Sequence, residues 1–482
     1  MVNASALPQG IAVPSVPALR HIDKRFIPAE LWFAIAPAER IEMTPGQQIA
    51  EGTRLSLAGQ PIYAPVTAVV MRLETDKVVL KPLQTQVEAP LTTPTFAPLA
   101  ERDKDAIISR VRAAGITGMG GAGFPAWRKL AALPHGPMPL LLINAVECEP
   151  GCGADAVLLE FEPDAVAHGM DVLADALQAT QVVLACKRSA LDAATTVTRL
   201  SSGQRARTVV MDDRYPAGDE RVLCKQLGHS LTLKQRPVER GVIVFNVATV
   251  AAIGAAVCRG MVPTFRRITV HGPGVATPSV VEVMLGTPAA EVLAALGVSD
   301  YSAGVAVGGA MMSQPLNLRE AAIGQSTTAL YVPARHAQRA RAACINCGRC
   351  DPVCPQALAV ARLYELIEAA RPLEAVAALD VQGCTGCGCC DAICPSGIPL
   401  AATLRDARTA VLEQRASAVS AAIAKARSDS HVQRERQREA QRVSRLRQRG
   451  DSHGRTKDKV DAMLRAARQR RNAANDGSSH DA

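Results

Sequence analysis

Nine of the fourteen cysteines lie between residues 344 and 394, and eight of them form two runs of identical spacing. Each run reads C-x2-C-x2-C-x3-C and is followed by proline, at Pro355 and at Pro395. This spacing is typical of ferredoxins that hold two [4Fe–4S] clusters. The sequence therefore predicts an internally duplicated iron–sulfur module, whose common use is to pass single electrons in series.

The fourth cysteine of each run is expected to bind the cluster of the other run, because the chain and the proline turn it away from its own triplet. One predicted ligand set is Cys344, Cys347, Cys350 and Cys394, and the other is Cys354, Cys384, Cys387 and Cys390. Zinc is the alternative. Paired structural zinc sites, however, use two CxxC knuckles without a third cysteine two residues on.

The remaining cysteines fit neither ligand set. Cys389 lies beside Cys390 and is interpreted as a bystander thiol. The others are scattered and are expected to be small buried hydrophobes: Cys148, Cys152, Cys186, Cys224 and Cys258. Disulfides are not expected, because the N-terminus shows no signal peptide and a reducing compartment keeps thiols free.

A glycine-rich loop is the second candidate site. Gly118, Gly120 and Gly123 satisfy G-x-G-x-x-G, but residues 105–114 before them read as a helix, whereas the dinucleotide fingerprint requires a strand there. A Rossmann interpretation therefore fails. The loop could still bring its backbone close to a flat or phosphorylated ligand; a merely flexible loop is the alternative.

The elements that must position these sites follow from periodicity. Residues up to about 100 show short Pro-, Thr-, Val- and Gly-containing runs typical of a small all-β unit. From about 103 to 249, apolar strands alternate with helical periods, which predicts a parallel α/β sheet. Residues 265–333 are again β-rich, and 344–394 form the cysteine segment.

Charge is concentrated at the C-terminal end of the 482-residue chain. The formal net charge is +9, and residues 421–482 hold 16 Lys or Arg and 8 Asp or Glu, which is +8. The basic balance therefore belongs to a tail, and no nucleic acid is expected as a partner. The one membrane-span candidate, residues 241–258, is interrupted by Asn246, Thr249 and Gly254, so we interpret it as a strand followed by a buried helix.

The segments GITGMGGAGFPAWRKL (115–130) and LLINAVECEP (141–150) resemble the FMN subunit of respiratory complex I. Together with the YPAGDE segment and the two cysteine runs, they are still more similar to the RnfC/RsxC family, a peripheral component of Rnf/Rsx ion-translocating electron-transport complexes. The resemblance covers about residues 20–412. It implies a multidomain α/β and α+β fold: a barrel-sandwich-like unit at 1–100, an FMN/NADH-binding-like domain at 101–262, an SLBB-like β-grasp domain at 263–333, a two-cluster ferredoxin domain at 334–412, and a basic helical or disordered tail at 413–482.

The resemblance also implies roles for individual residues. Gly118, Gly120, Gly121 and Gly123 would line the flavin, and Phe124 would pack against the nicotinamide nucleotide. Lys129 would contact its phosphates, and Asn144 and Glu149 would lie around FMN and NADH. Gly218 and Glu220 match the loop that receives the nucleotide, and Asn246 and Thr249 match a segment near the flavin phosphate.

Several positions depart from the family patterns. Val146 stands where complex I has an acid that bonds the flavin, and Asp219 replaces a glycine usual in the RnfC/RsxC family. Gly151, Cys152 and Gly153 replace bulkier residues. The N-terminal unit lacks the lysine that biotinyl and lipoyl domains modify, so we expect a docking surface rather than a covalent carrier.

The resemblance implies a peripheral electron-transfer subunit that passes electrons from NADH, through FMN, to two clusters and on to membrane partners, as part of an ion-translocating NADH:ferredoxin-type oxidoreductase. Expected partners are the other Rnf/Rsx subunits and ferredoxin-like carriers, at the cytoplasmic face of a bacterial inner membrane. The rival is a non-catalytic adaptor with a relic flavin fold. A subunit of a flavin-dependent hydrogenase or formate dehydrogenase is a further alternative, although those usually have a different cysteine arrangement.

Overall fold

The computed structural model describes most of the chain. Residues 1–9, where the sequence predicts no leader, lie outside the described part, which comprises 10–12, 20–22, 27–35, 37–56, 59–83, 95–133, 136–202, 206–233, 235–334 and 341–476. The chain divides into two compact units, Met1–Arg408 and Thr409–Ala482.

A four-stranded parallel sheet lies at the centre of the first unit. Its order is β11 (Val242–Asn246), β7 (Leu140–Ala145), β8 (Gln181–Cys186) and β9 (Ala206–Val210). The first three strands in this order are apolar and almost wholly buried, as expected where helices cover both faces. The predicted alternation of strands and helices between 103 and 249 is confirmed.

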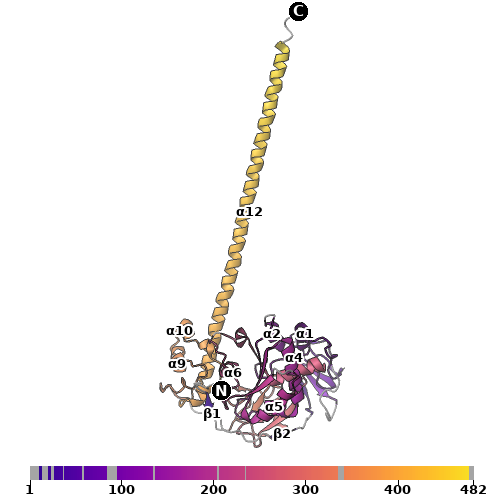
Figure 1. The fold of residues 1–482 in the computed structure, drawn as a ribbon, viewed down its shortest axis with the longest axis vertical. Helices are drawn as coiled ribbons and strands as arrows, with labels where there is room; N and C mark the ends of the chain where they lie inside the picture. The colour runs from indigo at the N-terminus through magenta and orange to yellow at the C-terminus, as the bar shows by residue number, and fades with distance from the viewer. Residues whose placement is uncertain are drawn as a thin grey trace, which may run out of the picture. The chain divides into compact units, whose positions relative to one another are not determined.

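The helices divide between the two faces of this sheet, and several of them are labelled in Figure 1. One face holds the larger core, with side chains from α1 (Lys104–Ala113), α2 (Ala126–Ala131), α3 (Ala154–Phe161), α4 (Pro163–Ala176), α5 (Leu191–Leu200) and α7 (Val247–Cys258). The other face packs against α6 (Glu220–Gln226). The strand β11 and helix α7 divide residues 242–258 as the sequence predicts.

A second, antiparallel sheet comes from the N-terminal region. Its order is β3 (Leu31–Ala34), β6 (Lys77–Pro82), β5 (Ala68–Leu73) and β4 (Gln48–Ile49). Two further short strands of the same region pair elsewhere: β1 (Ile11–Ala12) with β10 (Arg214–Tyr215), and β2 (Arg20–Ile22) with β13 (Ser279–Met284). The N-terminal residues thus join sheets formed by later parts of the chain.

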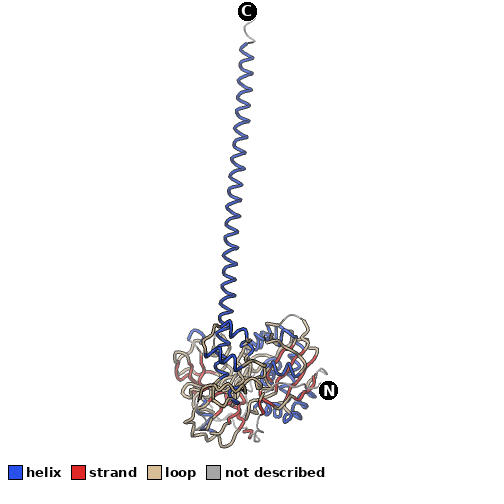
Figure 2. The backbone as a smooth tube through the Cα atoms, turned by 90° about the vertical axis from the view of Figure 1, so that its left-hand side faces the viewer, coloured by secondary structure: helices blue, strands red, loops and turns tan. Residues whose placement is uncertain are grey.

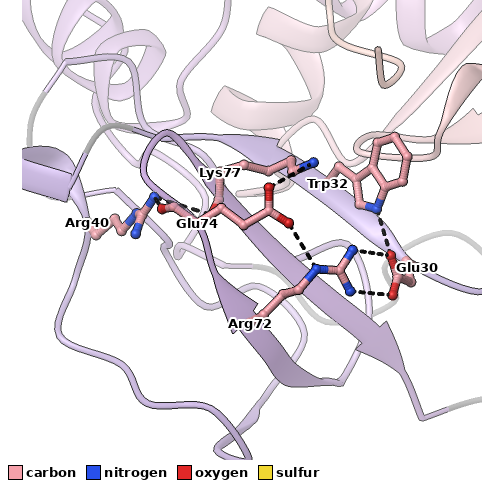
Figure 3. A network of polar contacts seen from close by, with 6 residues as sticks. All are labelled: Glu30, Trp32, Arg40, Arg72, Glu74 and Lys77. Atoms are coloured by element: carbon pink, nitrogen blue, oxygen red, sulfur yellow. Dashed lines mark hydrogen bonds and ion pairs between the residues drawn. The ribbon is translucent and has the colours of Figure 1, made fainter. Parts of the chain in front are cut away.

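The outer surface of this sheet carries a charged network (Figure 3). Arg72 makes two hydrogen bonds to the Glu30 carboxylate, 2.7 and 3.0 Å, and one to Glu74, 2.9 Å. Trp32 Nε1 donates to Glu30, and Lys77 pairs with Glu74 at 3.2 Å. The hydrogen bonds from Arg72 lower the pKa of the Glu30 carboxyl. Because these groups are partly exposed to solvent, the network contributes little to stability.

The third sheet is mixed and follows the parallel domain. Its order is β15 (Gln314–Pro315), β14 (Ala306–Val307), β16 (Ala329–Tyr331), β12 (Phe265–His271), β13 and β2. The helix α8 (Ala289–Ala295) contributes Val292 and Leu293 to its core. The barrel-sandwich description of the second sheet and the β-grasp description of the third remain predictions.

The cysteine segment contains short helices: α9 (Val360–Glu368), α10 (Leu373–Ala378) and α11 (Cys389–Ile393). Short 3-10 helices occur at Pro37–Glu39, Arg188–Ala190, Pro237–Arg240 and Val381–Gly383. The last helix is α12 (Leu400–Asp476), which is by far the longest helix of the described residues (Figure 2). Within the described part of the chain, no helix has both the length and the apolar composition needed to span a bilayer.

Candidate functional site

The predicted flavin residues gather at the carboxyl edge of the parallel sheet. Asn144 lies near the end of β7 and Asn246 ends β11, and the two are register partners in adjacent strands. Ligands of open α/β sheets bind at this edge. The Asn246 side chain also caps α7 by accepting the Ala248 N–H, 3.0 Å.

The glycine loop is held against the start of α7. The Met119 N–H donates to the buried Thr249 hydroxyl at 2.9 Å. A Cβ on Gly120 would lie 3.2 Å from the Asn246 Cβ, which is tighter than ordinary contact. Asn246 and Thr249 therefore lie beneath the loop. As the sequence predicts, a helix and not a strand precedes it, since α1 ends at Ala113.

The outer edge of the loop fits a flat, phosphorylated ligand such as FMN. Gly120, Gly121 and Ala122 are exposed, and within the described part of the chain their amide groups have no protein acceptor. Successive unpaired amides of this kind suit anionic oxygens. Gly121 and Gly123 have φ values of +105° and +63°, which favour glycine.

Three predicted nucleotide-contacting residues surround this edge. The Phe124 side chain is 53% exposed, unusual for a large apolar ring. Lys129 forms an ion pair with Glu220, with 2.9 Å between Nζ and Oε1, and its ammonium lies 5.3 Å from the centroid of the Phe245 ring. Lys129 and Glu220 are 91 positions apart in sequence, and the fold brings these two predicted nucleotide-contacting residues together.

Asn144 and Gly218 are also in contact with each other, whereas the Glu149 carboxylate binds a different segment of the chain. Asn144 Nδ2 donates to the Gly218 carbonyl, 2.9 Å. The Glu149 carboxylate accepts the N–H groups of Met311 and Met312 at 2.9 and 3.0 Å. Burial raises the pKa of Glu149. Glu149 is therefore fixed to the loop between β14 and β15.

The departures from the family patterns have local explanations. Val146 is 4% exposed and packs in the apolar cluster with Met211 and Leu223, so an acid there would place a charge in a core. Asp219 caps α6 by accepting the N–H groups of Arg221 and Val222 at 2.9 and 3.2 Å.

The Gly151–Cys152–Gly153 stretch packs on strand β12 of the third sheet. A Cβ on Gly151 would lie too close to the His271 ring, and the Gly153 N–H donates to Thr269 Oγ1 at 3.1 Å. Cys152 Sγ lies 3.7 Å from His271 Nε2. Burial lowers the pKa of His271 to about 4. The small residues therefore leave room for His271.

The eight predicted cluster ligands line two separate cavities. One is lined by Cys344, Cys347, Cys350 and Cys394, and the other by Cys354, Cys384, Cys387 and Cys390, with Cys389 beside them. This grouping is the one expected for crossed ligation. Within the described residues, no three His, Cys, Asp or Glu side chains converge to hold a single metal ion. An iron–sulfur cluster needs more widely spaced thiolates, because its iron and sulfide ions lie between them.

The internal duplication is also visible in the hydrogen bonds. Asp351 and Asp391 follow the third cysteine of each run, and each accepts an N–H ten residues on: Ala361 at 2.9 Å and Ala401 at 2.7 Å. Ser396, two residues after Cys394, donates to the Ala343 carbonyl at 2.9 Å. The end of the second run is thereby tied to the beginning of the first.

Tyr215 connects the flavin-like region to the second cavity. Its hydroxyl donates to the Cys387 carbonyl at 2.6 Å, and its ring is 1% exposed. Met311, which Glu149 holds, packs in the same cluster with Cys387 and Cys389. Cys389 is 1% exposed. A continuous protein path therefore runs from the edge of the flavin-like sheet to the second cavity.

Sequence reasoning missed three residues of this region: Tyr215, Arg266 and Gln325. Tyr215 lies in the YPAGDE segment that the resemblance singled out, but its partner is 172 residues away. Arg266 and Gln325 belong to the third sheet and its loops, where no motif marked them. Their contacts depend on tertiary structure alone.

Comparison with known proteins agrees with this geometry. Residues 111–255 match the Nuo51 FMN-binding domain, and residues 340–398 match a 4Fe-4S dicluster domain. The chain is 34% identical over 314 residues to the C subunit of the ion-translocating oxidoreductase complex of Rhodobacter capsulatus, and 34% identical over 344 residues to its counterpart in Pseudomonas aeruginosa. The predicted resemblance is confirmed.

The aligned regions cover 64% of this chain and 60% of the Rhodobacter protein, and 70% of this chain and 44% of the Pseudomonas protein. The chain thus spans about half the length of the curated relatives it matches. The crystal structure of an NAD+-reducing [NiFe]-hydrogenase in the H2-reduced state aligns over 63% of this chain and 61% of that chain, with 24% identity and a TM-score of 0.44.

Proposed function

We propose that this protein is an electron-transfer subunit of an ion-translocating oxidoreductase, which takes electrons from NADH through FMN and passes them along two [4Fe–4S] clusters. The observation that carries this proposal is the placement of the cysteine cavities. The second cavity lies against Tyr215 and Met311, which lead directly from the flavin-like edge. A relic flavin fold that only presented a ferredoxin module would not need this path.

FMN, when bound, would accept the hydride of NADH and release its two electrons one at a time, as one-electron clusters require. The loop amides of Gly120 and Gly121 would hold its anionic groups. Phe124 would pack on the nucleotide, and Lys129 would leave Glu220 to meet the phosphates. Asn144, Gly218, Asn246 and Thr249 would fix the loop and the strand ends beneath the flavin.

The exposure of the cysteines supports an order of transfer. Cys354, Cys384, Cys387 and Cys390 are buried next to the flavin-like domain, whereas Cys344 and Cys347 are exposed. Electrons would therefore reach the cluster of the buried cavity first and leave through the cluster of the exposed cavity. Recipients would be the other subunits of an Rnf/Rsx-type complex, or ferredoxin-like carriers, at the cytoplasmic face of the membrane.

An anaerobic visible spectrum of the reconstituted full chain tests this function. We expect flavin absorbance on top of the cluster band, and bleaching of both by NADH. Phe124→Ala and Glu220→Ala should keep FMN and slow NADH-driven bleaching about tenfold, while dithionite bleaches the clusters normally. If the wild-type chain holds both clusters but binds no FMN, the adaptor function is correct instead.

A further inference from the structure

The third sheet reaches across to the glycine loop through one buried arginine. Arg266, on β12, is 5% exposed. Its Nη2 donates to the Met119 carbonyl at 2.5 Å, and its Nε donates to the Thr327 carbonyl at 3.1 Å. The Met119 N–H donates to Thr249, so both the N–H and the carbonyl of Met119 are held by hydrogen bonds.

Gln325 makes a second connection between the same two regions. Its Oε1 accepts from the N–H and the hydroxyl of Thr117, at 3.0 and 3.2 Å, and its Nε2 donates to the Gly115 carbonyl at 2.8 Å. The neighbouring residues Ser326 and Thr328 lie beside Gly123 and Gly121. The segment 324–328 therefore follows the glycine loop along most of its length.

Two buried carboxyl groups interact electrostatically with the Arg266 guanidinium. Its electrostatic partners are the carboxyl groups of Asp155 and Glu147, whose pKa values burial raises. Asp155 accepts from Asn246 Nδ2 at 2.7 Å, and Glu147 accepts the N–H groups of Ala154 and Asp155. Arg266 thus joins the glycine loop, the strand end at Asn246 and the start of α3 in one polar network.

We propose that Arg266 and Gln325 are positioning residues for the flavin site, through which the third sheet holds the glycine loop in the conformation that receives FMN. This inference rests on the proposed flavin function. It gives the third sheet a specific role, in that two of its side chains set the shape of a site formed by another domain. Neither residue need touch the flavin, because both act through the loop backbone.

Arg266→Met tests the inference, with Arg267→Met as the matched control. Arg267 is the next residue of the same strand, has a side chain only 12% exposed and pairs with Glu162 and Glu282 away from the loop. Both variants therefore lose a largely buried arginine. We expect Arg266→Met to weaken FMN binding by about tenfold or more, the factor that one charge-assisted hydrogen bond is worth, and Arg267→Met to leave it unchanged.

Hydrogen–deuterium exchange without flavin gives a second readout that does not depend on activity. We expect faster exchange of residues 115–124 in Arg266→Met, and wild-type exchange there in Arg267→Met, with iron content the same in both. Should Arg266→Met not fold, Gln325→Ala is expected to show the same two effects. Wild-type FMN affinity and loop exchange in the folded variants would overturn the inference, whereas failure of the wild type to bind FMN would overturn the proposed function.

Discussion

The two cysteine cavities have the same ligand spacing in sequence but different surroundings in the structure. The first is lined by Cys344 and Cys347, which are exposed, and has Ile345 at its rim, 68% accessible. Each predicted ligand of the second cavity is at most 9% exposed, and Tyr215 packs against it. Duplication supplied the ligands, and the packing of the flavin-like domain made one cavity internal.

This difference supports the proposed order of electron transfer through an otherwise symmetrical module. A buried cluster is suited to receive electrons within the protein, and an exposed one to deliver them to a partner. Arg408 strengthens the asymmetry, since its side chain donates to the Cys384 carbonyl at 2.8 Å in the buried cavity.

Breaking one crossed ligand should have the largest effect. We expect Cys354→Ala to remove the cluster of the second triplet and Cys394→Ala that of the first triplet, because each fourth cysteine lines the other run's cavity. Each variant should hold about four of eight irons or fewer, since the shared module loses its folded unit. Iron analysis and spectra check this. Loss of the same-run cluster with the other one intact would contradict crossed ligation.

Removing the flavin should leave both cavities intact. We expect Gly123→Val to lower FMN affinity at least about tenfold while iron content is unchanged, because a side chain is strained at φ +63° and would meet Ser326 at 3.4 Å. Gly228→Val is the matched control: it has φ +85° with nothing within 4 Å of the added Cβ. Flavin fluorescence measures both variants, and equal FMN loss in the two would refute a specific effect at the loop.

Solvent access should distinguish the two clusters in the intact protein. We expect a water-soluble iron chelator to remove iron in two phases whose rates differ several-fold. The fast phase should come from the cluster in the cavity of Cys344 and Cys347, which are exposed. Cluster spectra recorded during chelation identify which one is lost. A single phase, or earlier loss of the buried cluster, would contradict the proposed difference in solvent access.

Removing the C-terminal tail should have the smallest effect. Residues 431–449 carry seven arginines with few apolar side chains, and the described side chains of α12 from 412 to 449 are exposed. We expect truncation after Gln414 to leave both clusters and NADH-to-flavin transfer unchanged and, at most, to weaken recovery with anionic membranes in a salt-sensitive way. Loss of either cluster would show that the tail belongs to the folded module.

Local patterns predict much of this architecture. The strand and helix within 242–258, the helix before the glycine loop and the separation of the cysteines into two sets all follow from spacing and periodicity. For the tail, composition alone does not decide between helix and disorder. Tyr215, Arg266 and Gln325 could not be found, because each acts on a residue far away in sequence and has no motif of its own. The pairing of β1 and β2 with later strands was missed for the same reason.

Electron transfer in series through the two cavities is tested most directly by deleting one cluster at a time. The substituted residue is a cysteine of a triplet, because its assignment to a cluster is the same with or without crossed ligation. NADH is added anaerobically to the FMN-loaded full chain, and cluster reduction is followed by electron paramagnetic resonance. In Cys347→Ala, we expect the buried cluster to be reduced at the wild-type rate. In Cys384→Ala, we expect the exposed cluster to stay oxidised with NADH yet to be reduced by dithionite. Reduction of the exposed cluster by NADH at the wild-type rate in Cys384→Ala would contradict the proposed order of transfer.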